Sequence, residues 1–136
     1  MAVGHIAAAV GKWALSKAFK YIRKWRQAAM MAHLLRKAQS LANERARLVA
    51  DTAKMLVSKP YPPASAAGEP PHLREGDLQE SIGWRPGRIG KCEAFVYANS
   101  PHARILEEGT RLMEPRPFMR PAIARCRRRF TRIVLR

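Results

Sequence analysis

The stretch from Lys12 to Val57 contains neither glycine nor proline and is rich in Ala, Leu, Lys, Arg, Gln and Met. All of these residues are good helix formers, so the stretch predicts helix throughout. A single helix of this length would extend on the order of 70 Å, since each residue adds about 1.5 Å. That is long for a chain of 136 residues, and the helix therefore dominates any fold the chain can adopt.

The apolar side chains of this stretch change sides along its length. On a helical wheel the early ones gather opposite the basic residues: Leu15, Ala18, Phe19, Ile22, Trp25 and Ala29. Beyond Met30 the apolar stripe moves to another side: Leu34, Leu35, Ala38, Leu41, Ala42, Leu48, Val49, Thr52 and Leu56. Two stripes out of phase imply two packing partners and favour a break in the helix. We therefore divide the chain into a basic amphipathic arm, 1–33, and a domain, 34–136, whose core is covered by 34–57.

The remainder of the chain alternates turn signals with short apolar segments. The proline-rich segment 60–71 cannot continue a helix and predicts an extended loop. Strands are expected at 77–84 and 93–98, with Phe95 and Tyr97 on one face, a short helix at 102–108, and a last helix from Pro121. The expected fold class is α+β, with a long N-terminal helix packed on a small, mainly antiparallel sheet, a short helix and a basic C-terminal helix.

Positive charge is concentrated at the two ends of the chain. The formal net charge is +16; residues 1–60 carry 12 basic and 2 acidic side chains, 61–110 carry 5 and 7, and 111–136 carry 9 and 1. This distribution favours a polyanionic or acidic partner over a merely solvated basic surface. The candidate DNA-facing residues are Lys17, Lys20, Arg23, Lys24, Arg125, Arg127, Arg128 and Arg129. The candidate protein-interface residues are Leu15, Phe19, Ile22, Trp25 and Tyr61.

Catalytic patterns are absent from the sequence. The four histidines are scattered without metal-ligand spacing, and Glu107 and Glu108 are adjacent, so on a helix they point about 100° apart. We therefore expect no catalytic residues, no metal ligands, no cofactor and no enzymatic activity. The two cysteines lack metal or redox spacing and are expected to be free thiols in a reducing compartment. No stretch has the roughly 20 apolar residues that cross a bilayer, so an integral membrane protein is not expected. The amphipathic arm would also suit an anionic membrane surface, but protein and DNA contacts are favoured and no membrane partner is expected.

Three segments in the second half resemble a bacteriophage family of neck, tail-completion or putative tail-component proteins. Gly68-Glu69-Pro70-Pro71 with Gly76-Asp77-Leu78-Gln79-Glu80-Ser81-Ile82 is similar to the family's proline loop followed by Thr-Gly-x-Leu-x-x-Ser-Ile. The segment 101–110 is similar to Tyr-Ala-x-x-x-Glu-Phe-Gly-Thr, and 116–123 to Arg-Pro-Phe-Leu-x-Pro-Ala-Leu. The matching residues are Gly76, Leu78, Ser81, Ile82, Ala103, Glu107, Gly109, Thr110, Arg116, Pro117, Phe118, Pro121 and Ala122.

The resemblance covers roughly 34–130 and implies a structural role in the virion. Proteins of this family form homo-oligomeric rings at the head-tail junction, around the DNA channel, in contact with a connector or adaptor and with a tail terminator or tail tube. The chain would then be made in the bacterial host cytoplasm and end in the virion. Glu75, His102 and Glu108 depart from the family pattern. The alternative, which rests on charge and on the aromatic and basic residues of the arm, is a small basic nucleic-acid-binding protein.

Overall fold

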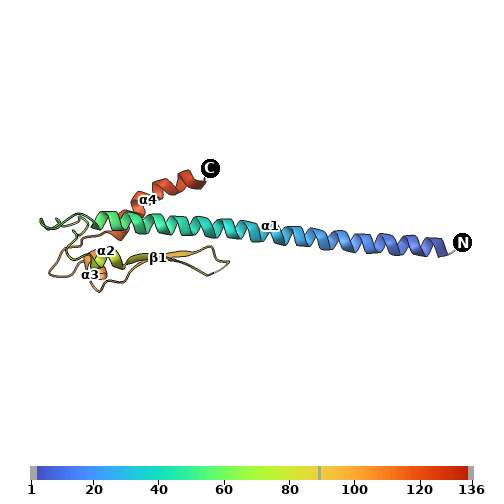
Figure 1. The fold of residues 1–136 in the computed structure, drawn as a ribbon, viewed down its shortest axis with the longest axis horizontal. Helices are drawn as coiled ribbons and strands as arrows, with labels where there is room; N and C mark the ends of the chain where they lie inside the picture. The colour runs from blue at the N-terminus through green and yellow to red at the C-terminus, as the bar shows by residue number, and fades with distance from the viewer. Residues whose placement is uncertain (1–2, 89, 135–136) are drawn as a thin grey trace. The chain divides into compact units, whose positions relative to one another are not determined.

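A computed structural model describes residues 3–88 and 90–134, with side chains described for 16–88 and 90–130. The elements follow in the order α1 (Val3–Val57), α2 (Asp77–Ser81), β1 (Ile82–Pro86), β2 (Ala94–Ala98), α3 (Ala103–Glu108) and α4 (Met119–Val134) (Figure 1). The expected α+β class is confirmed. The chain forms two compact units, Met1–Ala38 and Gln39–Arg136. Each unit is described separately.

Helix α1 is continuous from Val3 to Val57, so the expected break near Met30 is wrong. It also begins nine residues before Lys12 and includes Gly4 and Gly11. Each internal glycine disfavours helix by about 1 kcal/mol relative to alanine, and the alanine-rich sequence around them offsets this cost. A change of apolar side therefore changes what the helix packs against without interrupting its hydrogen bonds.

In the first unit, every described side chain from Ser16 to Lys37 is exposed. The sequence of this segment alone gives a sufficient reason for its helicity, because it combines alanines with long unbranched side chains. Burial on α1 begins only in the second unit, at Ala46 and then at Val49, Ala50 and Ala53. Leu34 and Leu35 are exposed and do not belong to the core.

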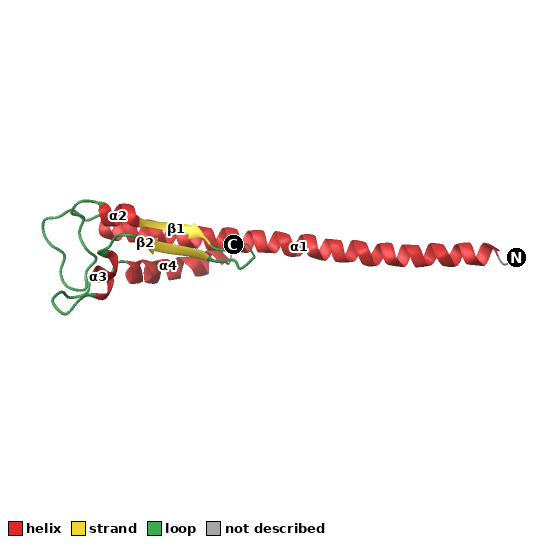
Figure 2. Ribbon diagram, turned by 90° about the horizontal axis from the view of Figure 1, so that it is seen from below, coloured by secondary structure: helices red, strands yellow, loops and turns green. Residues whose placement is uncertain are grey.

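The second unit has one hydrophobic core. In both ribbon views the hairpin of β1 and β2 and helix α4 lie beside the C-terminal part of α1 (Figures 1 and 2). The buried core residues come from α1, β1, α3 and the α4 region: Val49, Ala50, Ala53, Leu56, Val57, Ile82, Ala103, Phe118, Ala122 and Cys126. Phe118 is the largest of the fully buried side chains. The residues that fill this core therefore lie up to 77 positions apart, between Val49 and Cys126.

The sheet consists of two antiparallel strands, in which Ile82 pairs with Ala98 and Pro86 with Ala94. Side chains alternate between faces along a strand, so Ile82 and Trp84 pack on the core while Phe95 and Tyr97 are exposed on the other face, as expected. The Tyr97 ring lies over Gly83, where a Cβ atom would come within 2.8 Å of the ring. The side-chain amide of Gln39 donates a hydrogen bond from its Nε2 to the Glu93 backbone carbonyl at 2.9 Å, and this bond joins the hairpin to α1.

Residues Asp77–Ser81 form helix α2, so the expectation of a strand beginning at Asp77 is wrong. Gly76 has a φ of 90°, which reverses the chain immediately before the helix. Acidic Asp77 and Glu80 lie in the first turn, where negative charge stabilises the unpaired backbone N–H groups. The Ser81 hydroxyl donates to the Leu78 carbonyl at 2.7 Å within the same turn. Local hydrogen bonds thus decide this segment, and the strand begins only at Ile82.

The proline-rich loop 60–71 is attached to the second unit along its length. The Tyr61 amide donates to the Leu73 carbonyl at 3.1 Å, and the Leu73 amide donates to the Lys59 carbonyl at 2.7 Å. Further along, the Gly68 amide donates to the Pro115 carbonyl at 3.0 Å. Ser65 and Pro71 are buried. The loop is therefore held at its base and at Gly68, while most of its other side chains are exposed.

Candidate functional site

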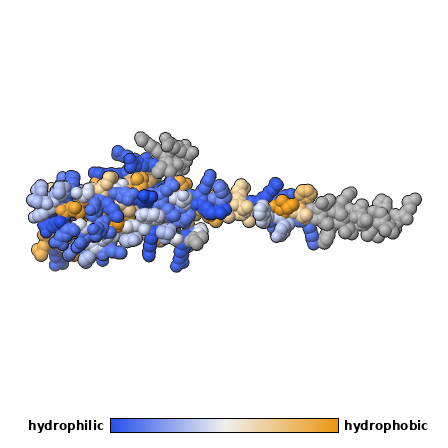
Figure 3. Space-filling model, in the orientation of Figure 1, coloured by the Kyte–Doolittle hydropathy of each residue, from blue (hydrophilic) through white to orange (hydrophobic). Residues whose placement is uncertain are grey.

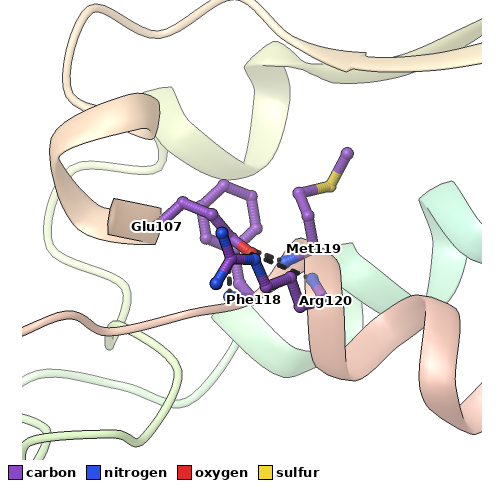
Figure 4. A network of polar contacts seen from close by, with 4 residues as sticks. All are labelled: Glu107, Phe118, Met119 and Arg120. Carbon is purple, nitrogen blue, oxygen red and sulfur yellow. Dashed lines mark hydrogen bonds and ion pairs between the residues drawn. The ribbon is translucent and has the colours of Figure 1, made fainter. Parts of the chain in front are cut away.

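The second and third family-like segments meet at the carboxylate of Glu107. Its two oxygens accept hydrogen bonds from the backbone amides of Phe118, Met119 and Arg120, at 2.9, 3.0 and 3.0 Å (Figure 4). These amides start helix α4, where the first N–H groups have no partner within the helix. The negative carboxylate also opposes the positive end of the helix dipole. We call this arrangement the Glu107 cap, and it fixes where α4 begins relative to α3.

The apolar residues of the family-like segments lie in the core. Ile82, Ala103, Phe118 and Ala122 are buried together, and Leu78 packs against them. Arg116 of the third family-like segment makes a polar contact as well: its backbone amide donates a hydrogen bond to the Leu106 carbonyl at 2.7 Å. Two further members are half-buried prolines at the entry to α4: Pro117 and Pro121. The segments therefore determine the fold, and their side chains converge on no reacting atom.

Gly109 and Thr110 end α3 and reverse the chain. Gly109 has a φ of 76°, and its amide donates to the Ile105 carbonyl at 2.8 Å. A side chain at this glycine would come within 2.9 Å of the Met113 carbonyl oxygen. The Thr110 hydroxyl accepts hydrogen bonds from the amides of Leu112 and Met113 at 3.3 and 3.1 Å. Both residues therefore shape a tight turn after α3.

A pocket of about 470 Å³ opens beside these segments, and sequence reasoning did not predict it. It lies between the proline-rich loop, the turn before α2, and α3. Ser65 is 4% exposed, lines the pocket, and its hydroxyl has no hydrogen-bond partner in the described part of the chain. His72 and His102, which are far apart in sequence, also line it. The described residues include no group of three or more His, Cys, Asp or Glu side chains placed to hold a metal ion.

The expected interface residues of the arm are exposed wherever the structure describes them. Phe19 is 64% exposed and Trp25 is 66% exposed, and Ile22 and Met30 are exposed as well. Apolar side chains are visible on the surface of this segment (Figure 3). The side chain of Leu15 lies outside the described residues. Tyr61, the remaining interface candidate, is partly covered by the Arg74 guanidinium, which lies 4.6 Å from the centre of its ring.

The expected DNA-facing residues are likewise at the surface. Lys17, Lys20, Arg23 and Lys24 are exposed on the arm, and Arg125, Arg127, Arg128 and Arg129 are exposed on α4. Arg127 and Arg128 line a shallow hollow on α4 together with three residues that the sequence pattern did not single out: Arg120, Ile123 and Ala124. The sequence of α4 contains no acidic residue. This helix therefore presents one sign of charge.

Comparison of the chain with protein-family models, with curated proteins and with solved structures found no match. The family resemblance therefore depends on the three segments alone. No helix in the described part of the chain has the length and hydropathy needed to cross a bilayer.

Proposed function

We propose that the chain is a structural, non-enzymatic subunit of the head-tail junction of a tailed bacteriophage, where copies form a ring that joins connector and tail around the DNA channel. The observation that carries an assembly role is the exposed apolar stripe of the arm, with Phe19, Ile22 and Trp25 in water. Apolar surface of this kind marks contacts with other molecules. The assignment to the junction is supported by the three family-like segments, which meet at the Glu107 cap and the core.

The charge of the arm restricts what covers its stripe. From Met1 to Ala38 the sequence has Lys and Arg but no Asp or Glu. Arms that packed only on one another would bring like charges together, which is unfavourable. The apolar stripe of the arm therefore docks on another virion protein, and its basic face turns towards DNA or an acidic surface. Contacts between neighbouring copies of the chain in the ring are heterologous, because one patch meets a different patch on the next subunit.

Electron microscopy of particles labelled with an antibody against the chain tests this proposal. Label at the single vertex where head meets tail supports it, and label spread over the capsid contradicts it. Phe19→Ser should abolish incorporation into particles. Tyr21→Ser is the matched control, because residues two apart on a helix point about 200° apart and Tyr21 is an exposed aromatic residue as well. Equal loss with both variants would contradict docking through the stripe.

A basic nucleic-acid-binding protein is the second candidate, and the surface of α4 favours it. Arg120, Arg127 and Arg128 surround the small residue Ala124, without an acidic side chain on the helix. Arginine side chains at such a surface contact phosphates and release counterions, so binding weakens steeply with salt. Tight binding of the purified chain to duplex DNA at physiological salt, with no label on particles, would favour this candidate over the junction protein.

A further inference from the structure

Leu112 is the most exposed large apolar residue of the described chain, with 99% of its surface in water. Its position is nevertheless fixed, because the turn Thr110–Met113 is closed by backbone hydrogen bonds in both directions: the Thr110 amide donates to the Met113 carbonyl at 2.8 Å, and the Met113 amide returns one at 3.4 Å. The Thr110 hydroxyl holds the two amides at the tip. The turn therefore presents a leucine outward in one orientation.

The 470 Å³ pocket provides apolar surface on which an exposed side chain such as Leu112, here called the knob, can be buried. Its apolar lining comes from five elements of the second unit: Val57, Pro71, Leu78, Ile105, Leu106 and Met113. The buried Ser65 hydroxyl, which lacks a partner, can both donate and accept a hydrogen bond. A buried polar group in this state is unfavourable until it is paired. The pocket is larger than one leucine side chain, so it also admits the peptide groups of a turn, which satisfy the hydroxyl.

Charged side chains of both signs flank the leucine turn and line the pocket. Arg111 and Glu114 flank the leucine turn and are exposed. The pocket is lined by acidic Glu75 and Asp77 and by basic Arg74 and Arg116. A turn with one charge of each sign thus meets groups of both signs. The turn of the same copy leaves the pocket open, since Met113 lines its wall while Leu112 points into water.

We propose that the Thr110–Met113 turn of one copy inserts Leu112 into this pocket of a second copy. The inference rests on the proposed function in one respect, since both require copies of the chain to associate. It adds the residues that make the contact, and it assigns Thr110 and Gly109 a role in presenting the knob.

Two complementary variants test the contact in the full chain. Leu112→Ser removes the knob and keeps the pocket, whereas Ile105→Trp fills the pocket and keeps the knob. Sedimentation of the wild type should reveal self-association, and each variant alone should associate about 10- to 100-fold more weakly, as expected for loss of one buried leucine. Ile123→Ser is the matched control, because it removes an exposed aliphatic side chain on α4. It should associate like the wild type.

The decisive measurement is a 1:1 mixture of the two variants. One supplies an intact pocket and the other an intact knob, so association should return in the mixture, which non-specific apolar adhesion does not predict. Thermal melting checks that the variants fold, and His102→Trp replaces Ile105→Trp if the latter melts early. Wild-type chains that stay monomeric, unchanged association of Leu112→Ser, or a mixture that stays monomeric would each overturn the contact. If Leu112→Ser still labels the head-tail vertex normally, the contact fails while the proposed function stands.

Discussion

Two parts of helix α1 differ in the burial of their apolar stripes. Residues 16–37 and residues 46–57 of α1 both carry an apolar stripe, yet the first is exposed throughout and the second is buried against β1, α3 and α4. Amphipathic pattern alone therefore does not identify the partner of a helix. It indicates that a partner is needed. For residues 46–57 that partner lies within the chain, and for residues 16–37 we propose that it lies outside the chain.

The largest expected effect on stability comes from removing the aromatic ring of Phe118, which is buried in the core. Phe118→Ala should lower the free energy of unfolding by about 3–5 kcal/mol, because it deletes a large buried side chain and leaves a cavity. Phe19→Ala removes the same ring from the exposed arm and should change it by less than about 0.5 kcal/mol. Urea denaturation of both variants measures the contrast. Equal effects would mean that the arm is part of the folded core.

The Glu107 cap gives a smaller effect. Glu107→Gln keeps the shape of the side chain but replaces one oxygen by a nitrogen and removes the charge that three amides share. We expect a loss of about 1–2 kcal/mol of stability in urea titration. Glu108→Gln is the control, because Glu108 is exposed and pairs only with Arg104 at 3.0 Å on the helix surface, which contributes about 0.5 kcal/mol or less. If Glu107→Gln were as stable as Glu108→Gln, the Glu107 cap would not stabilise the fold.

Deleting residues 1–33 tests the same comparison by removing most of the exposed part of α1. The described side chains of this segment are exposed, so the remaining domain should lose less than about 1 kcal/mol of unfolding free energy. Its incorporation into particles should nevertheless fail. Thermal melting and particle labelling measure the two effects separately. A domain that unfolds without the arm would show that the arm stabilises its own subunit.

The smallest effect on stability is expected on α4. Changing Arg125, Arg127, Arg128 and Arg129 together to Gln should shift the melting temperature only slightly, since exposed charges contribute little. Attraction to DNA or to an acidic surface should decrease, most clearly at low salt. Binding assays over a range of salt concentrations measure this loss. A strongly destabilised protein with intact assembly would contradict a surface role for these arginines.

Long-range periodicity and turn chemistry predicted most of the fold. Val49 and Leu56 were expected in the core, and β2, α3 and α4 begin within one or two residues of their predicted positions. The prediction of a strand over Asp77–Ser81 was wrong, because its apolar residues suit either structure, and the reversal at Gly76 together with local hydrogen bonds selects a helix. The continuity of α1 was also missed, because a change of apolar side was taken as a break.

The candidate sites were predicted unevenly. Phe19 and Trp25 could be predicted as interface candidates, because an apolar stripe beside basic residues is visible in the sequence alone, and the structure shows both side chains exposed. The pocket was not, since Ser65, Leu78 and Ile105 come from separate segments and meet only through tertiary packing. Leu112 carried no signal either, as a single leucine between turn residues is equally common in a core.

Helix α4 follows every other element and carries Ala122 and Cys126 into the core, beside Phe118, which immediately precedes the helix. Ribosomes add about 5–20 residues per second, so several seconds separate the synthesis of Val57 from that of Cys126. During that interval the buried face of α1 has no α4 to cover it. Nascent chains that stop before α4 therefore expose a second apolar surface in addition to the arm, which makes them targets for chaperones and proteases.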